Sequence, residues 1–188
     1  MLPQLRLISI QKVWCGMDDF CPVKSGDQVL DNARLRRLYG RYPTGVAAVC
    51  ALREGRPAGI VATSFTPVSM EPALVSICVQ LTSTTWPELT KGGHLGVSVL
   101  ASMHEAASRQ LAAKNVDRFA GLSWFASDTG AVFLADAAAW LDCSISDSIP
   151  VGDHEVVLLQ VNRSAIDEAA EPLIFHDSRY RALVGIDE

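Results

Sequence analysis

The chain lacks the features by which several protein classes are recognised. Its 16 Lys and Arg residues stand against 21 Asp and Glu residues, which leaves a net charge of −5 over 188 residues. Nucleic-acid binding requires clustered basic side chains, so we expect no nucleic-acid partner. No apolar run approaches the ~18 residues that span a bilayer, and no signal-peptide pattern follows Arg6 and Lys12. We therefore expect a cytoplasmic protein without a membrane segment.

Paired cysteines and the common catalytic motifs are missing as well. The five cysteines are Cys15, Cys21, Cys50, Cys78 and Cys143. They form no C-x-x-C pair, and the histidines have no metal-ligand spacing, so we expect no metal site. The last three cysteines lie in apolar runs, where cysteine usually behaves as a small core residue. The chain also has no Rossmann or P-loop glycine motif and no G-x-S-x-G nucleophile elbow.

Short apolar segments separated by turn residues make up most of the chain. We expect an irregular N-terminal arm over residues 1–24 and a single domain over 25–188. The helix pattern predicts helices over 27–39, after a capping box of Ser25 and Gln28, and over 104–114. Strands are expected over 46–52, 58–64, 73–80, 95–100, 137–145 and 155–161, with a short one over 173–175. The predicted fold class is mainly β, an antiparallel barrel or sandwich with a few peripheral helices.

Two hydroxyl-rich segments are candidates for ligand binding. The segment 63–69 lies at the end of a predicted strand, where the strand gives way to a loop, and Pro67 and Pro72 bracket that loop. Its hydroxyls and amides suit the edge of a heterocycle or a phosphate, although such loops often satisfy only their own backbone. The segment 82–85 precedes Trp86-Pro87, where a helix is expected to begin. It suits an anion, with a plain N-cap by Thr84 or Thr85 as the alternative.

A third candidate is the tripeptide Gly152-Asp153-His154, at the turn that enters a strand. An Asp beside a His can orient the ring and hold its pKa near neutrality. Turns favour Gly and Asp for purely structural reasons, so the tripeptide alone is a weak signal.

In order and spacing, these clusters resemble the flavin reductase family of FMN-binding split barrels. These are the small reductase components of two-component flavin-dependent monooxygenases. The resemblance runs from about residue 42 to 180. Its motifs include Pro43-Thr44-Gly45-Val46, the stretch 59–65, Ser83-Thr84-Thr85, the stretch 96–101, Arg118-Phe119, the stretch 139–143, Gly152-Asp153-His154 and Pro172-Leu173. Ser98 stands where the family usually has Asn, and Ser148-Ile149-Pro150 replaces the aromatic residue that often precedes Gly-Asp-His.

The resemblance implies an antiparallel split β-barrel and a role for each matching residue. The cofactor-binding residues are then Thr63, Ser64, Phe65, Ser69, Ser83, Thr84, Thr85, Leu100, Ala101, Arg118 and Phe119. The segment 83–85 would hold the phosphate of the flavin with Arg118 as its charged partner. Leu100 and Ala101 would form a wall against the flavin ring. His154 would face the nicotinamide, with Asp153 shaping the turn.

The implied function is an NAD(P)H:flavin oxidoreductase. It would pass hydride from NADH or NADPH to FMN or FAD and supply reduced flavin to a separate oxygenase component. The resemblance also implies a homodimer. Two alternatives stay open at this point. One is a flavin-binding carrier or sensor without catalysis, and the other is a related split-barrel oxidase that acts on a small amine.

Overall fold

The computed structural model describes residues 31–185, which fall into two compact units divided after Leu38. Helix α2 (Asn32–Tyr39) lies in the first unit except for its last residue, and at its start the amide of Ala33 donates to Asp31 Oδ1 over 2.9 Å. The helix expected over 27–39 is therefore confirmed for its C-terminal part. The capping box of Ser25 and Gln28 and the arm over 1–24 lie outside the described residues.

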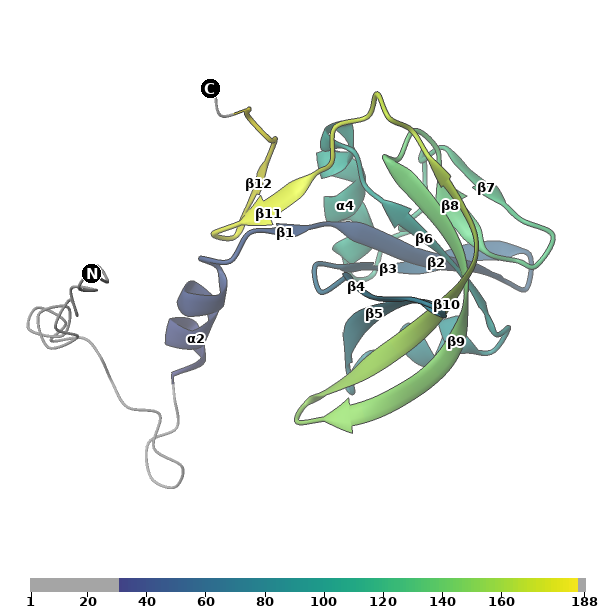
Figure 1. The fold of residues 1–188 in the computed structure, drawn as a ribbon, viewed down its shortest axis with the longest axis horizontal. Helices are drawn as coiled ribbons and strands as arrows, with labels where there is room; N and C mark the ends of the chain where they lie inside the picture. Colours follow the sequence, from purple (N-terminus) through teal and green to yellow (C-terminus); the bar gives the residue numbers. More distant parts are fainter. Residues whose placement is uncertain (1–30, 186–188) are drawn as a thin grey trace, which may run out of the picture. The chain divides into compact units, whose positions relative to one another are not determined.

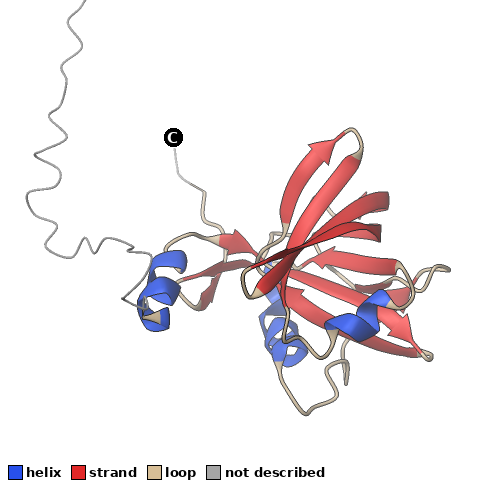
Figure 2. Ribbon diagram, turned by 90° about the horizontal axis from the view of Figure 1, so that it is seen from below, coloured by secondary structure: helices blue, strands red, loops and turns tan. Residues whose placement is uncertain are grey.

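The second unit is a barrel unit built almost entirely from antiparallel strands (Figures 1 and 2). A curved sheet of seven strands has the order β3-β2-β6-β9-β10-β5-β4, a second sheet joins β1, β11 and β12, and β7 pairs with β8. The strands are β1 (Thr44–Gly45), β2 (Ala47–Arg53), β3 (Arg56–Ala62), β4 (Thr66–Met70), β5 (Ala73–Gln80), β6 (His94–Val99), β7 (Trp124–Ala126), β8 (Val132–Leu134), β9 (Ala139–Val151), β10 (His154–Ile166), β11 (Ile174–His176) and β12 (Arg179–Arg181). The helices of this unit are α3 (Trp86–Thr90), the 3-10 turn η1 (Ser102–His104) and α4 (Glu105–Ala112).

Strand β2 lies between the two hydrophobic cores of the barrel unit. Its residues alternate, so that Val49 and its neighbours on one face enter the first core, while Cys50 and Ala48 enter the second. The first core also contains inward side chains of β5, β6, β9 and β10 and is filled by Trp86 of α3. The second core packs α4 and β8 against the opposite face of the sheet. A strand buried on both faces reads as a continuous apolar run, which matches residues 46–51.

Strands β9 and β10 form a long hairpin. Each strand has 13 residues, which corresponds to about 40 Å of extended chain. Register shifts between Leu158 and Leu159 and between Val161 and Arg163 let the pair bend along the sheet. The turn at the end of the hairpin places Gly152 at a φ of 63°, a conformation that favours glycine. The sequence predicted both strands but underestimated their length.

Three expectations from the sequence require correction. The segment between Pro67 and Pro72 is not simply a loop, because Thr66–Met70 forms β4 and pairs with β5. Proline is compatible with this position because β4 is an edge strand. Thr84 and Thr85 do not cap α3 through their side chains, since Ser83 Oγ accepts the hydrogen bond from the amide of Trp86. Cys78 is not a core residue, because the alternation of β5 buries Ile77 and Val79 and leaves Cys78 exposed.

The family departure at Ser98 has a structural role. Ser98 is completely buried, and its hydroxyl accepts a hydrogen bond of 3.1 Å from the amide of Leu134. A buried backbone amide at this position thus has a partner, and the bond fixes β8 over β6.

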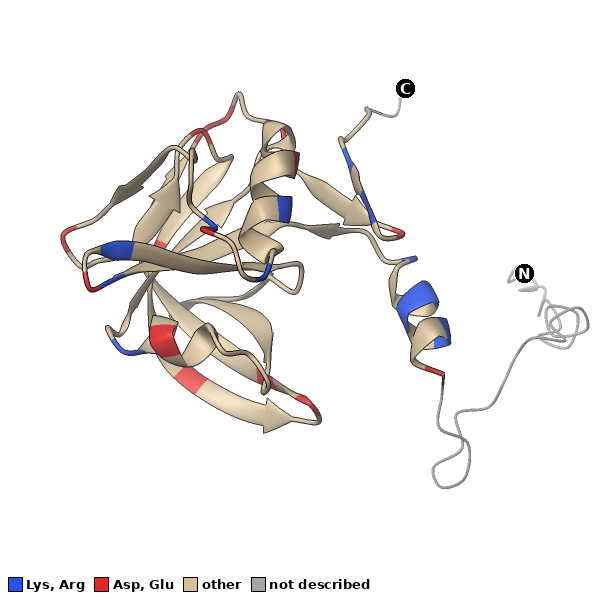
Figure 3. Cartoon of the chain, turned by 180° about the vertical axis from the view of Figure 1, so that it is seen from behind, with Lys and Arg blue, Asp and Glu red and all other residues tan. Residues whose placement is uncertain are grey.

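Charged side chains of the barrel unit are spread over many elements (Figure 3). The one buried carboxylate, within the described residues, belongs to Asp142, which accepts a hydrogen bond of 2.7 Å from Arg163. Arg163 also pairs with Asp128, and this link joins the β7–β8 hairpin to β9 and β10. Over residues 31–185 no helix has the length and apolar character to cross a membrane. The same range contains no group of three side chains suited to a metal ion.

Gly96 offers a test of the packing between β6 and β8. A Cβ atom at Gly96 would lie 2.1 Å from the carbonyl oxygen of Val132, a backbone atom that cannot move alone. We expect Gly96→Ala to lower the free energy of unfolding by about 1–3 kcal/mol, the typical range for overpacked cores. Gly45→Ala is the matched control, because a Cβ there meets nothing within 4 Å. Urea unfolding that gives both variants the stability of the parent protein would contradict this account of the packing.

Candidate functional site

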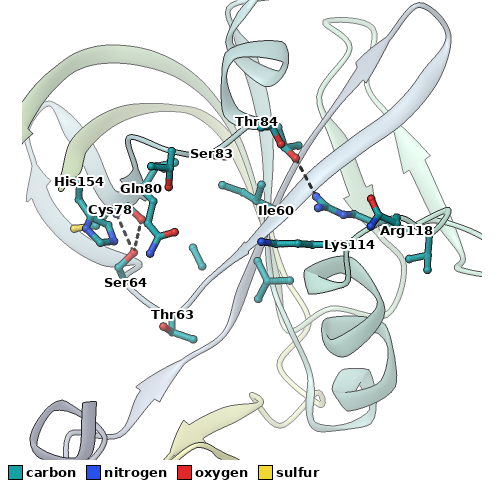
Figure 4. A pocket seen from close by; sticks show the side chains of 17 residues that line it. Ile60, Thr63, Ser64, Cys78, Gln80, Ser83, Thr84, Lys114, Arg118 and His154 are labelled. Atoms are coloured by element: carbon teal, nitrogen blue, oxygen red, sulfur yellow. Dashed lines mark hydrogen bonds between the residues drawn. The ribbon is translucent and has the colours of Figure 1, made fainter. Parts of the chain in front are cut away.

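A cavity of about 850 Å³ opens at the end of the barrel unit where β3 and β5 lie next to two loops (Figure 4). This volume lies in the range of small-molecule sites, roughly 300–1,000 Å³. Its walls come from the end of β3, from β5, from the segment 82–85, from the segment 114–118 and from the first residue of β10. The lining residues are Ile60, Val61, Ala62, Thr63, Ser64, Cys78, Val79, Gln80, Thr82, Ser83, Thr84, Thr85, Lys114, Asn115, Val116, Arg118 and His154.

The cavity brings together the three polar clusters that the sequence singled out. Of the residues expected to form the site, it is lined by Thr63, Ser64, Ser83, Thr84, Thr85, Arg118 and His154. Figure 4 shows His154, Ser64 and Ser83 toward one end and Arg118 toward the other. Segments that lie far apart along the chain thus meet at a single place.

The hydroxyl of Ser64 connects two walls of the cavity. Ser64 Oγ accepts a hydrogen bond of 2.8 Å from the amide of Cys78 and donates one of 3.2 Å to the carbonyl of the same residue. The bonds join the chain just after β3 to the C-terminal part of β5. Because the hydroxyl donates its one proton to protein, it serves mainly to hold the cavity wall in place. Thr63, the preceding residue, lines the cavity beside it.

The segment 82–85 is held by bonds from two directions. Ser83 Oγ accepts from the amide of Trp86 at 3.1 Å, which fixes the start of α3. Thr85 Oγ1 accepts from Arg118 Nη1, also at 3.1 Å. These contacts give the segment a defined shape toward the cavity before any ligand is present, which is how preformed sites keep their geometry.

His154 lies at the start of β10, opposite Gln80 in the register with β5. Its Nδ1 is 2.7 Å from Asp153 Oδ1. The hydrogen bond from the His154 ring, together with the charge of that ring, lowers the pKa of Asp153 below its ordinary value. Asp153 is thus a carboxylate near neutral pH and orients the imidazole, while its own side chain stays largely in solvent. Asp153 itself does not line the cavity.

Five other residues expected to bind cofactor lie away from this cavity. Leu100, Ala101 and Phe119 are buried, and Leu100 and Phe119 belong to the second core. Backbone bonds to Val46 and Leu173 hold Leu100 in place, and its side chain lies in the second core. Phe65 packs on the first core, and Ser69 lies on β4. The sequence order of the motifs did not distinguish residues that line the cavity from residues that pack behind it.

Sequence reasoning missed several lining residues, notably Cys78, Gln80 and Lys114. The alternation of β5 was a signal for the first two, because it places Cys78 and Gln80 on the face opposite Val79. Lys114 was assigned to a helix. In the structure α4 ends at Ala112, and Asn115 has a φ of 61°. Asn tolerates this left-handed conformation, and the turn brings residues 114–116 to the cavity.

Known proteins with similar sequences were compared with the chain. The family model described as "Flavin reductase like domain" matches residues 39–184. The flavin reductase of Pseudomonas putida is 32% identical over 158 residues, which is 84% of this chain and 93% of that protein. The flavin-dependent monooxygenase reductase subunit HsaB of Rhodococcus jostii is 30% identical over 83% of this chain and 80% of its own length.

Solved structures were compared in the same way. The NADH:FAD oxidoreductase SgcE6 of Streptomyces globisporus, in complex with NAD and FAD fragments, superposes with a TM-score of 0.78. The two sequences are 35% identical, and the match covers 84% of this chain and 97% of that one. The split-barrel fold that the resemblance implied is confirmed.

The exposure of Cys78 leads to a prediction about thiol chemistry. Burial raises the pKa of Cys50 to about 12, and burial with the nearby Asp142 charge raises the pKa of Cys143 to about 12. Because the thiolate is the reactive form, both thiols should resist alkylation. In a Cys15→Ser, Cys21→Ser background, we expect a maleimide to label one thiol per folded chain, at Cys78. Peptide mass spectrometry locates the label. A ligand that fills the cavity should slow the labelling, because Cys78 lines it, and modification of Cys50 or Cys143 at the same rate would contradict the prediction.

Proposed function

The chain belongs to the family of flavin reductase like domains and is an NAD(P)H-dependent flavin reductase, and we propose that the cavity is where it binds FMN or FAD and the nicotinamide. The observation that supports this assignment is the convergence of the three clusters on the cavity. The hydroxyl segments 63–64 and 82–85 and the ring of His154 line it together.

The residues at the cavity fit a flavin by their chemistry. A flavin mononucleotide has an apolar ring, a polar ring edge and a phosphate. Ile60 and Val79 offer apolar surface, and Thr63 and Gln80 offer hydrogen-bonding groups. Lys114 and the hydroxyls of segment 82–85 suit the phosphate. The cavity volume of about 850 Å³ is large enough to admit more than one ring system.

The protein contributes binding and alignment to the reaction. Bound flavin supplies the acceptor for the hydride of NADH or NADPH, which is the chemistry of the cofactor itself. The residues of the cavity hold the two ring systems in contact, which replaces a bimolecular encounter by an oriented one. We assign the nicotinamide to the end of the cavity lined by His154, whose ring is oriented by Asp153. The walls between β3 and β5 keep this geometry through the Ser64 bonds.

Further proposals concern the partners, the location and the domain boundaries of the enzyme. Reduced flavin leaves for a separate oxygenase component, as the similarity to HsaB, the reductase subunit of a flavin-dependent monooxygenase, suggests. The protein forms a homodimer, for which the exposed apolar residues Ile149 and Val151 at the end of the β9–β10 hairpin offer a contact surface. Its cytoplasmic location stays a prediction from the sequence. Domain boundaries at residues 24 and 25 are a proposal as well.

The enzyme is expected to oxidise NADH or NADPH rapidly when free FMN or FAD is added. The absorbance at 340 nm measures the rate under air and under nitrogen, with riboflavin as a third acceptor. Turnover should follow the flavin concentration to saturation, because flavin acts at a defined site. A chain that binds flavin but leaves NADH and NADPH unoxidised would instead be a carrier or sensor. Flavin reduction driven by a small amine without nicotinamide would indicate an oxidase.

The substitution His154→Ala tests whether His154 positions the nicotinamide at its end of the cavity. We expect kcat/KM for the nicotinamide to fall by about 10- to 100-fold, as for loss of a positioned side chain, while the flavin Kd changes little. His176→Ala is the control, because His176 lies on β11 and does not line the cavity. Stopped-flow reduction and flavin fluorescence separate the two effects. Unchanged turnover in His154→Ala would remove His154 from the mechanism.

A further inference from the structure

Two cations lie at the end of the cavity away from His154, and they differ in their contacts. Arg118 is partly buried and bonded to protein through Nε and Nη1, whereas Lys114 is exposed at the cavity (Figure 4). This difference matters because the sequence expectation gave the phosphate of the flavin to Arg118. The inference below rests on the proposed function of the same cavity.

Arg118 links three walls of the site. Its Nε donates to the carbonyl of Ala113 at 2.8 Å, just after α4. Its Nη1 donates to the carbonyl of Gly59 on β3 at 3.0 Å and to the hydroxyl of Thr85 at 3.1 Å. The three acceptors lie 5, 59 and 33 residues from Arg118 along the chain. One planar guanidinium therefore holds the loop after α4, the sheet and the segment 82–85 at fixed distances, which the fork geometry of Arg allows and a Lys does not.

Lys114 is placed by that arrangement, and its side chain has no hydrogen-bond partner among residues 31–185. It follows Ala113, the residue whose carbonyl Arg118 holds, and the left-handed turn at Asn115 comes directly after it. Over residues 31–185, Lys114 forms no ion pair with a carboxylate. Lys114 lines the same cavity as Thr84 and Thr85, whose segment is the other half of the expected phosphate site.

We propose that Lys114 is the residue that selects phosphorylated flavins, FMN and FAD, over riboflavin, and that Arg118 is a positioning residue that holds the walls around it. A charged donor at a phosphate strengthens only those ligands that carry the phosphate. A clamp between walls affects every flavin equally, because all of them use the same ring site. The two roles therefore predict different patterns across a series of flavins.

The experiment measures Kd and KM for FMN, FAD and riboflavin in the full-length enzyme. Lys114→Gln should raise the Kd of FMN and FAD about tenfold, the value typical for loss of a charge-assisted hydrogen bond, and leave riboflavin unchanged. The preference of the parent enzyme for FMN over riboflavin should weaken with added salt, and this salt dependence should be reduced in the variant. Lys91→Gln is the matched control, since Lys91 pairs with Glu88 and does not line the cavity.

Arg118→Gln and Arg118→Lys test the second half of the proposal. Both should weaken binding of all three flavins by a similar factor and lower the Tm, and retention of the positive charge in Arg118→Lys should not restore affinity. A loss restricted to FMN and FAD in Arg118→Gln would assign the phosphate to Arg118 and overturn the proposal. So would a Lys114→Gln variant that binds FMN normally, or one that loses riboflavin to the same extent.

These measurements distinguish failure of the Lys114 proposal from failure of the proposed function. A parent enzyme that binds no flavin and oxidises no NADH or NADPH refutes both the function and the inference. A parent enzyme with normal turnover but equal affinity for FMN and riboflavin refutes the inference alone. Circular dichroism shows whether each variant folds. If Arg118→Gln does not fold, the flavin affinities of Arg118→Lys test the role of Arg118 instead.

Discussion

Burial of β2 on both of its faces is the constraint on which the site depends. One face of the strand closes the first core, and the other lies beneath α4 and β8. Because β2 is fixed from two sides, β3 beside it has a fixed position as well. The end of β3 then supplies one wall of the cavity. Ser64 joins that wall to β5, and Arg118 joins it to the loop after α4. The geometry of the site is thus inherited from the packing of a strand that does not line it.

The polar residues of the cavity divide into two kinds. Ser64, Ser83 and Arg118 have hydrogen bonds to the protein that hold the walls together. Thr63, Gln80 and Lys114 line the same space and present side chains to it. A site built in this way is preorganised, since its supporting bonds exist before the ligand arrives. If the cavity binds flavin and nicotinamide as proposed, the same division would let the walls hold the two rings in a fixed relative orientation.

Much of this arrangement was predictable from the sequence. The strand at 73–80 was predicted with its observed bounds, and those near 46–52, 58–64 and 95–100 were found within two residues. Apolar alternation and turn residues suffice for this, because they act over a few neighbours. Strand β4 was missed, since Pro67 and Pro72 indicate a loop unless the strand lies at an edge. Only pairing with β5 stabilises it there. The length of the β9–β10 hairpin depends similarly on pairing along its whole span.

By itself the sequence determined the fold class, the family resemblance and the order of the three polar clusters, because local pattern and spacing carry that information. It did not determine which members of each cluster are available to a ligand. Only the tertiary structure decided that Leu100 and Phe119 pack inside, that Cys78 faces the cavity and that Arg118 is bonded to three walls. The physical reason is that a polar side chain can bind a ligand only where hydrogen bonds to other residues do not already use its donors and acceptors. Those partners come from residues such as Gly59 and Thr85, which are distant along the chain and close in the fold.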